Sequence, residues 1–189
     1  MLNFNEFDTE ENSFLKDFKD FLSGRNSTSN KISSIVSEII SQVRQKGDEA
    51  LKIYAKEFDN FEEEAFLVSK KEIDHSLENF DQDLMKSLDF SFYEIMNYQS
   101  QCFKSLNLQN SDKEITRKFR VIDSVGIYIP GGKASYPSTV LMGSAPALAC
   151  GVKNISLTSP AQYGVLDSRI IAAAKVAGIN SIYKIGGAQ

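Results

Sequence analysis

Two pairs of glycines are the residues of this sequence best suited to holding a small-molecule ligand. They are Gly131-Gly132 and Gly186-Gly187, and each pair follows a short run rich in β-branched and aromatic residues. A glycine pair lets a phosphate or nucleotide approach backbone N–H groups closely, because no Cβ stands in the way. Paired glycines also form tight turns with no ligand, so the pairs alone leave both interpretations open.

Side chains that bind metals or act as nucleophiles are scarce. His75 is the only histidine, and a lone imidazole in a charged run is more often a solvated or capping residue than a metal ligand. Nothing in the sequence supports a Ser-His-Asp triad built on it. Cys102 and Cys150 have neither CxxC spacing nor an activating neighbour. The residues therefore indicate no catalytic side chain and no zinc site made by this chain alone.

Two familiar phosphate-binding motifs do not fit. The run from Gly126 to Lys133 is one residue out of register for a P-loop, and Ala134 follows the lysine where a magnesium-binding hydroxyl is required. No G-x-G-x-x-G is present, and the run at 154–158 leads into Ser159 rather than an acid that could bind a ribose. Without a resemblance to known proteins, the residues predict only an α/β segment with an edge suited to a small-molecule ligand.

The elements that would position the glycine pairs form a parallel βαβαβ pattern. The starts of the expected strands lie about 26 to 30 residues apart, the length of a right-handed crossover unit. The carboxyl ends of parallel strands share one edge, where ligands bind, and here that edge carries 128–133, Ser159-Pro160 and 186–189. The strands are expected at 125–129, 154–158 and 181–185, and the helices at 137–150 and 166–177.

Residues 1–120 predict helices. Asp8 is expected to cap a first helix that Gly24 closes, and an isoleucine and valine stripe over 32–43 predicts a second. No constellation of side chains in this part carries chemistry by itself. Further helices are expected to continue past Gly47-Asp48 towards Phe58, to begin at a capping box spanning 69–72, and to run over about 83–103.

The composition changes near Arg120. Residues 121–189 hold all four prolines and nine of the 11 glycines but only seven charged residues, and the net charges of the two parts are −7 and +3. We therefore expect an α/β protein with two parts, a helical segment at 1–120 and an incomplete Rossmann-like parallel βαβαβ unit at 121–189.

The overall composition excludes several classes of protein. A hydrophobic content of 42% with 13 Phe and 7 Tyr excludes disorder, and no apolar stretch approaches the roughly 18 residues of a membrane span. The N-terminus lacks the pattern of a secretion signal, and only two cysteines favour a reducing cytoplasm. A net charge of −4 argues against nucleic acid or an anionic membrane as partner.

Several motifs resemble the L-histidinol dehydrogenase family. The resemblance covers the chain from about residue 30 to its end, and family members are more than twice as long. The motifs are VGIYIPGG at 125–132, YPSTVLM at 136–142, PA at 146–147, ACGVK at 149–153, AAAK at 172–175, IGGAQ at 185–189 and, upstream, VRQKGDEAL at 43–51.

The resemblance implies an NAD-dependent, zinc-requiring enzyme that oxidises L-histidinol through L-histidinal to L-histidine, the last reactions of histidine biosynthesis. It implies that Tyr128 and Gln189 contact NAD. Both lie on the edge that the strand pattern already indicates, and we expect them to end neighbouring strands. It also implies a homodimer with interlocked subunits, for which the apolar helix that contains Phe14 and Phe18 is a candidate. Packing of that helix onto its own chain is the open alternative.

Other parts of the family pattern are absent here. The resemblance places the zinc ligands and the catalytic glutamate–histidine pair beyond Gln189, so we expect the 189 residues alone to be inactive. Tyr98 stands where the family commonly has a histidine. A third strand without a covering helix would expose an edge and an apolar face, which favours a truncated chain over a complete domain.

Two hypotheses follow from the sequence. The chain is the N-terminal portion of a histidinol dehydrogenase, or it is a non-catalytic nucleotide-binding or assembly module that keeps the same sheet. Reading the gene past Gln189 discriminates them. An open frame with several histidines supports the enzyme, whereas a stop codon favours the module.

Overall fold

The computed structural model of the chain describes residues 6–62, 65–106, 119–131 and 134–189, with the backbone alone at 25–31 and 106. Contacts divide the chain into two compact units. Unit 1 is residues 1–48 with Ala188, and unit 2 is residues 49–187 with Gln189. The change of composition near Arg120 therefore falls inside unit 2.

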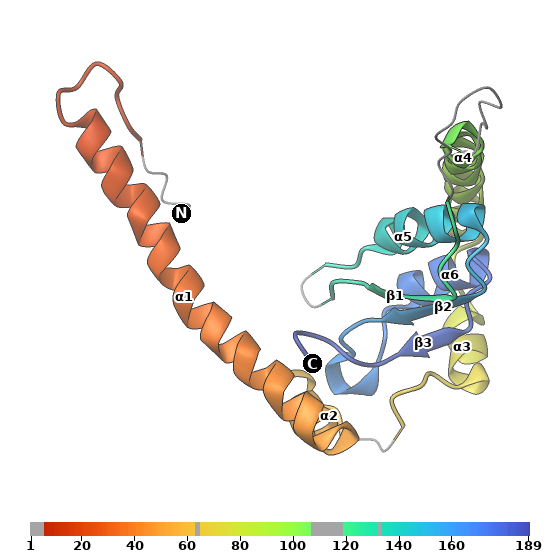
Figure 1. The fold of residues 1–189 in the computed structure, drawn as a ribbon. Helices are drawn as coiled ribbons and strands as arrows, with labels where there is room; N and C mark the ends of the chain where they lie inside the picture. Colours follow the sequence, from red (N-terminus) through yellow and green to blue (C-terminus); the bar gives the residue numbers. More distant parts are fainter. Residues whose placement is uncertain (1–5, 63–64, 107–118, 132–133) are drawn as a thin grey trace, which may run out of the picture. The chain divides into compact units, whose positions relative to one another are not determined.

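Unit 1 consists mainly of one long helix, α1, which spans Phe14–Lys46 (Figure 1). The prediction of two helices separated at Gly24 was wrong. A glycine inside a helix costs only about 1 kcal/mol, and no proline interrupts this stretch, so the helix continues. Ser13 rather than Asp8 occupies the N-cap position. Gly47 ends the helix with a φ of 58°, and its N–H donates to the Val43 carbonyl.

Three further helices follow, as the sequence predicts. They are α2 (Asp48–Asp59), α3 (Lys70–Leu77) and α4 (Gln82–Leu106). The capping box that begins α3 is confirmed: the Ser69 N–H donates to Glu72 Oε2 at 2.8 Å, and the Glu72 N–H donates to Ser69 Oγ at 3.2 Å. These bonds satisfy two of the donors that the first turn of a helix leaves unpaired.

The expected parallel βαβαβ unit is confirmed. The strands pair in the order β1-β2-β3, with Val125 opposite Ile155 and Leu157 opposite Ile182. Gly151 caps the first connecting helix in the left-handed region, at φ 87°. The elements are β1 (Ser124–Tyr128), α5 (Pro137–Cys150), β2 (Asn154–Thr158), the short 3₁₀ turn η1 (Gln162–Gly164), α6 (Ser168–Val176) and β3 (Ser181–Tyr183).

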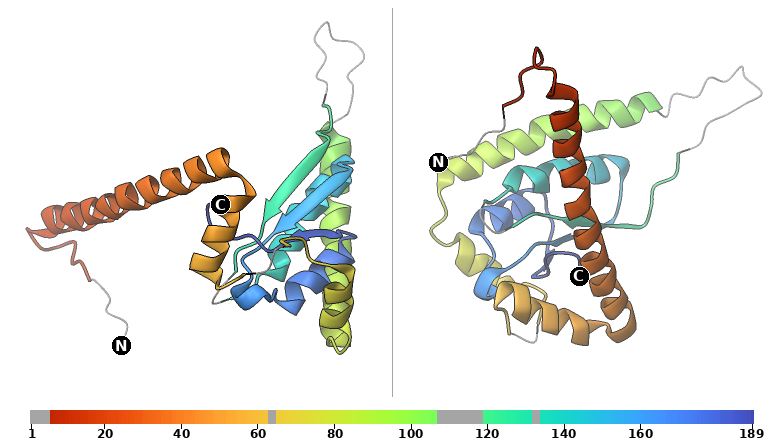
Figure 2. Two further views of the ribbon diagram at one scale, coloured as in Figure 1. Left: turned by 90° about the horizontal axis from the view of Figure 1, so that it is seen from below. Right: turned by 90° about the vertical axis from the view of Figure 1, so that its left-hand side faces the viewer.

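The core of unit 2 lies between the sheet and its connecting helices. Helix α5 packs on β1 and β2 and beside α6, and α4 lies against both helices (Figure 2). Apolar burial of this kind contributes roughly 25 cal/mol for each Å² removed from water. The largest fully buried side chains of this core are Ile129, Val140, Leu141, Leu157, Ile170, Ile171 and Ile182.

The outer edge of β3 is paired, and the expectation of an open edge was wrong. Leu67 forms an antiparallel bridge with Tyr183. The Val68 N–H donates to the Ile182 carbonyl, and the Lys184 N–H donates to the Phe66 carbonyl, both at 2.8 Å. Strand β3 ends at Tyr183, two residues earlier than predicted.

Lys184 lies just after β3 and is only 3% exposed. Its ammonium group lies 2.5 Å from Glu72 Oε1 and 5.4 Å from the centre of the Phe61 ring. A buried charge is stable only when it is paired, so this ion pair ties the first turn of α3 to the end of the sheet.

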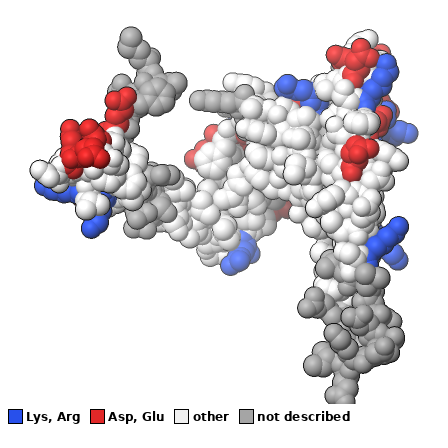
Figure 3. Space-filling view, turned by 90° about the horizontal axis from the view of Figure 1, so that it is seen from above, with Lys and Arg blue, Asp and Glu red and all other residues white. Residues whose placement is uncertain are grey.

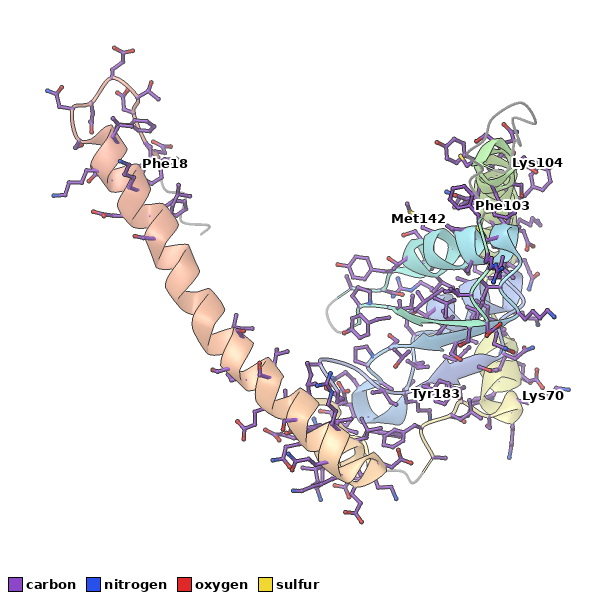
Figure 4. The ribbon with its side chains drawn as sticks, viewed as in Figure 1. Phe18, Lys70, Phe103, Lys104, Met142 and Tyr183 are labelled. Carbon is purple, nitrogen blue, oxygen red and sulfur yellow. The ribbon has the colours of Figure 1, made fainter. Side chains whose placement is uncertain are left out.

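The surface of unit 2 is unevenly charged. Helix α5 carries no charged residue, and on the face seen in Figure 3 uncharged side chains cover most of unit 2. Met142 is 64% exposed and points outward from α5 (Figure 4). Within the described ranges, no helix is both long enough and apolar enough to span a bilayer.

Candidate functional site

The loops that follow the three strands of unit 2 meet at one edge of the sheet, as parallel pairing requires. Pro160, in the loop after β2, contacts both the loop after β1 and the loop after β3. A Cβ added at Gly131 would lie 2.8 Å from Pro160 Cγ, and one added at Gly186 would overlap Cβ and Cα of the same proline. The chain needs glycine at both positions, because any side chain would push the loops apart. Gly132 and Lys133 lie outside the described residues.

Hydrogen bonds fix these loops to the strands. The Thr158 hydroxyl donates to the Ile185 carbonyl at 2.6 Å, and the Ser159 N–H donates to the Tyr183 carbonyl at 3.1 Å. The Ile129 N–H donates to the Thr158 carbonyl at 2.8 Å. Because each loop is bonded to its neighbour, the edge is preorganised before any ligand arrives.

Tyr128 ends β1 and is 46% exposed. Exposure alternates along β1, and Tyr128 lies on the exposed side while Ile127 packs against Gly143 of α5. The Gly187 N–H points at the Tyr128 hydroxyl oxygen at 3.4 Å. The first strand and the loop after the third strand therefore meet at this phenol.

Gln189 lies beside the same loop. Its Oε1 atom is buried and accepts no hydrogen bond from the described part of the chain. A Cβ added at Gly187 would lie 2.5 Å from that oxygen, and Gly187 has a φ of 66°. The structure thus places Tyr128 and Gln189 around Gly187. The expectation that they end neighbouring strands was wrong, because β2 lies between β1 and β3.

A cavity of about 310 Å³ opens beside the end of β2. Its wall includes Gly131 and Pro160 from the loop contact just described. Ser135 and Ser159 also line it, and their buried hydroxyl oxygens have no hydrogen-bond partner of good geometry among the described residues. Both oxygens are closed off from solvent, so they are buried polar atoms in the wall of the cavity.

Among the described residues that line the cavity, the charged one is Asp167, which caps α6. Its carboxylate accepts hydrogen bonds from the Arg169 side chain, from Nε at 2.9 Å and from a terminal nitrogen at 2.5 Å, and from the Arg169 N–H at 2.8 Å. The side-chain bonds lower the pKa of Asp167 below its ordinary value, although partial burial opposes them. The Ser135 side chain also lowers the pKa of Asp167. Asp167 is therefore an ionised acceptor.

A second carboxylate lies behind the cavity. Gln162 lines the cavity, and its amide donates to Asp59 Oδ1 at 2.6 Å and to the Phe58 carbonyl at 3.3 Å. Burial raises the pKa of Asp59, and the hydrogen bond from Gln162 offsets part of that rise. This contact holds the end of α2 against the loop that follows β2.

Sequence reasoning placed Ser159 on the ligand edge but missed the other polar residues of the cavity. Asp167 carries a local signal, since an aspartate directly before a helix is a typical N-cap. Ser135 and Gln162 carry none, because only the folding of distant loops brings them to the cavity.

The histidine and the cysteines lie outside this site. The His75 side chain is 85% exposed, and its Nδ1 lies 3.4 Å from Glu78 Oε2. Cys102 and Cys150 are both free thiols of intermediate burial. In the described part of the chain, no three His, Cys, Asp or Glu side chains group as they would around a metal ion.

Comparison with known proteins identifies the family. The model of the histidinol dehydrogenase family matches residues 22–189. The chain belongs to the histidinol dehydrogenase family. The match begins about eight residues before the resemblance that the motifs indicate.

Curated relatives of the chain come from several organisms. The histidinol dehydrogenase of Oceanobacillus iheyensis is 43% identical over 157 residues, which are 82% of this chain and 37% of that protein. The histidinol dehydrogenase of Gluconobacter oxydans is 37% identical over 186 residues, which are 96% of this chain and 43% of that protein. The chain thus spans about two fifths of the length of these relatives.

A solved member of the family has the same fold. The crystal structure of histidinol dehydrogenase from Elizabethkingia anophelis superposes with a TM-score of 0.74 at 31% sequence identity. The superposition covers 84% of this chain and 37% of that chain. The chain therefore shares its arrangement of helices and parallel strands with a solved histidinol dehydrogenase.

Proposed function

We propose that the whole protein is a cytoplasmic, NAD-dependent and zinc-requiring L-histidinol dehydrogenase. It oxidises L-histidinol through L-histidinal to L-histidine, and residues 121–189 contribute a Rossmann-like part that binds NAD. The family match over residues 22–189 is the observation that carries this proposal. When bound, NAD supplies the acceptor for the hydride that leaves the alcohol carbon.

The edge of the sheet fits NAD. The loops that contain Gly131 and Gly186 pack closely against Pro160, and the Tyr128 phenol is half-exposed at the same edge. The buried Gln189 Oε1 has no partner among the described groups, and an amide both donates and accepts hydrogen bonds. We propose that Tyr128 and Gln189 hold the cofactor and fix its orientation.

The described residues do not fit zinc, because no cluster of three His, Cys, Asp or Glu occurs among them. We therefore assign no zinc ligand and no catalytic acid or base within this chain. The proposal is that the 189 residues bind and position the cofactor, and that they do not turn over L-histidinol by themselves.

NADH formation from L-histidinol tests the proposal. We expect the whole protein to reduce NAD with zinc present, and the purified 189-residue chain to give no turnover above background. In the whole protein, Tyr128→Phe and Gln189→Ala should each raise the KM for NAD about 5- to 10-fold. Each variant removes one hydrogen bond to the cofactor, and the loss of roughly 1 kcal/mol of binding free energy corresponds to a change of this size. The kcat should change less, because the two side chains hold the cofactor.

Tyr93→Phe is the matched control, since Tyr93 is 62% exposed on α4. It removes the same hydroxyl and should leave both constants unchanged. Absence of L-histidinol-dependent NADH formation by the zinc-loaded whole protein would overturn the assigned reaction. An unchanged KM for NAD in both site variants would instead overturn the roles of Tyr128 and Gln189 alone.

A homodimer is part of the proposal. Unit 1 carries a cluster of aromatic rings around Phe18, whose centroid lies 5.5 Å from that of Phe7 and 5.6 Å from that of Phe14. Phe18 (Figure 4) is still 37% exposed, and Leu15, three residues before it in the same helix, is 68% exposed. We propose that a second subunit covers these side chains. Light scattering of the whole protein should give twice the mass of one chain, and a monomer mass would exclude this.

A further inference from the structure

A side chain joins the end of β2 to the loop that follows β3. The backbone bonds between these two strands reach Tyr183, whose carbonyl accepts from the Ser159 N–H at 3.1 Å. Two residues further along the chain, the Ile185 carbonyl accepts a hydrogen bond of 2.6 Å from the Thr158 hydroxyl. This distance lies at the short end of the range for O–H···O hydrogen bonds. Thr158 therefore extends the connection between β2 and the third strand beyond the residue at which β3 ends.

The Thr158 side chain lies on the same side of the sheet as the Tyr128 phenol. Thr158 is the register partner of Tyr128 on β1 and of Tyr183 on β3, and paired residues of neighbouring strands point to the same face. The loop that Thr158 holds also reaches Tyr128, because the Gly187 N–H points at the phenol oxygen at 3.4 Å. The Thr158 hydroxyl and the Tyr128 phenol thus hold the same loop from two neighbouring strands.

The Thr158 hydroxyl is committed to this loop. A hydroxyl group has one proton, and Thr158 donates it to Ile185, so that proton is not available to a ligand. Gln189 lies four residues after Ile185, and its Oε1 atom is buried without a partner among the described groups. Between them the chain turns at Gly187, where φ is 66°. The position of the Gln189 amide therefore depends on where the Ile185 peptide group is held.

We propose that Thr158 is a positioning residue of the NAD site, and that it acts on Gln189 through the Ile185 carbonyl. The inference rests on the proposed function, because it names a residue that orients one of the proposed cofactor contacts. Loss of the hydroxyl removes this donor from the Ile185 carbonyl and lets the loop at 185–189 move away from Tyr128. Cofactor binding must then order the loop, which weakens binding although no direct contact is lost.

Thr158→Val tests the inference, because valine keeps the shape of the side chain and removes the hydroxyl. In the whole protein we expect the KM for NAD and the calorimetric Kd for NAD to rise about 5- to 10-fold, with kcat changed by less than about twofold. Thr158→Ser keeps the hydroxyl and should hold both constants within about twofold of the wild type. A merely structural role would lower the melting temperature of the Thr158→Val protein and leave the Kd of the folded protein unchanged.

A double-variant cycle with Gln189→Ala tests whether Thr158 acts through Gln189. If it does, adding Thr158→Val to Gln189→Ala should raise the KM for NAD by no more than about twofold further, because the side chain that Thr158 positions is already gone. Independent effects would multiply and give a KM about 25- to 100-fold above that of the wild type.

Ser156→Ala is the matched control. Ser156 lies two residues before Thr158 on the same side of β2, and it pairs with Ser181 inside the sheet rather than with the loop after β3. Removal of its hydroxyl should leave the KM and the Kd for NAD unchanged. Melting curves followed by circular dichroism check that every variant is folded.

An unchanged Kd for NAD in the folded Thr158→Val protein would overturn the inference. Effects that multiply in the cycle would overturn it as well, and so would a Thr158→Ser protein that binds NAD as weakly as Thr158→Val does. None of these results alters L-histidinol-dependent NADH formation by the wild-type protein, so failure here is distinguishable from failure of the proposed function. A wild-type protein that does not bind NAD would overturn this inference together with the cofactor assignment.

Discussion

Lys184→Met is expected to lower the free energy of unfolding of unit 2 by about 2 to 3 kcal/mol. Removing one member of a buried ion pair typically costs about 3–5 kcal/mol. The Glu72 side chain is 42% exposed and keeps part of its hydration, so the expected loss is smaller. The variant also removes a cation from the Phe61 ring. Urea denaturation of the 189-residue chain, followed by circular dichroism, measures the loss.

Lys86→Met is the control for this experiment. Lys86 forms an ion pair of 2.9 Å with Asp83, but both side chains are at least three quarters exposed. Exposed pairs contribute about 0–1 kcal/mol, so this variant should change the free energy of unfolding by less than about 1 kcal/mol. Equal losses in the two variants would show that burial of Lys184 does not strengthen its pair.

The same pair predicts how stability depends on pH. Burial would raise the pKa of Glu72, but hydrogen bonds from Lys184 and Ser69 outweigh it and leave the pKa below the ordinary 4.5. A carboxyl with a lowered pKa in the folded state stabilises the fold above its unfolded pKa. That contribution is lost as the pH falls from about 4.5 through the lowered value.

Comparison of the variant with the wild type isolates this contribution. Burial raises the pKa of Asp59, so protonation of Asp59 acts in the opposite direction and adds stability as the pH falls through the raised value. Asp59 is unchanged in Lys184→Met, so its effect cancels in the difference. The stability difference between the two proteins should shrink below pH 4.5, and a constant difference down to pH 3 would contradict the ion pair.

Local patterns made most elements of unit 2 predictable from the sequence. The second strand was predicted at its observed residues, 154–158. The reason is that Gly151 precedes this short β-branched run and Pro160 follows it, so both ends of the strand are marked. The capping box of α3 is a contact between residues three apart, so its two partners can be read directly from the sequence. Helix α1 was the failure, since a single glycine is a weak stop signal without a proline or a tertiary contact.

The site was predictable only in part. Tyr128, Ser159 and the glycine loops follow strands, and parallel topology alone brings such positions to one edge. The cavity depends on contacts between residues far apart in the chain, such as the hydrogen bond from Gln162 to Asp59 across 103 positions. No spacing rule encodes such a contact, because it exists only after the loops have packed.

The covered edge of β3 was missed for the same reason. Segment 66–68 is too short to stand out as a strand, and it pairs with residues more than a hundred positions later. Its pairing supplies hydrogen bonds to backbone groups that would otherwise face solvent. Lys184 bonds to this segment through its backbone N–H, and its side chain pairs with Glu72.

Gly186→Ala is expected to destabilise unit 2 by about 2 to 3 kcal/mol and to disturb the candidate site. A Cβ at this position would overlap Cβ of Pro160 and would lie 2.8 Å from its Cα. A proline ring and a backbone atom cannot rotate away, so the loops after β2 and β3 must separate, and overpacking of this kind typically costs about 1–3 kcal/mol. Thermal and urea denaturation of the 189-residue chain measure the stability.

Gly126→Ala is the matched substitution. Gly126 lies within β1, and a Cβ added there meets no atom within 4 Å. Because glycine inside a strand costs about 0.5–1 kcal/mol relative to alanine, this variant should be as stable as the wild type or slightly more stable. The same chemical change thus has opposite expected effects, and only the distance to Pro160 separates them.

The effect of Gly186→Ala on NAD binding follows from where Pro160 lies. The proline walls the cavity beside β2 and contacts the loop that carries Gly187 towards Tyr128, so its displacement alters both parts of the edge at once. We expect the KM of the whole protein for NAD to rise by more than tenfold under conditions in which the variant remains folded, and to be unchanged in Gly126→Ala. A Gly186→Ala chain with wild-type stability would show that the loops after β2 and β3 are not in contact through Pro160, and the edge could then not act as one preorganised binding surface.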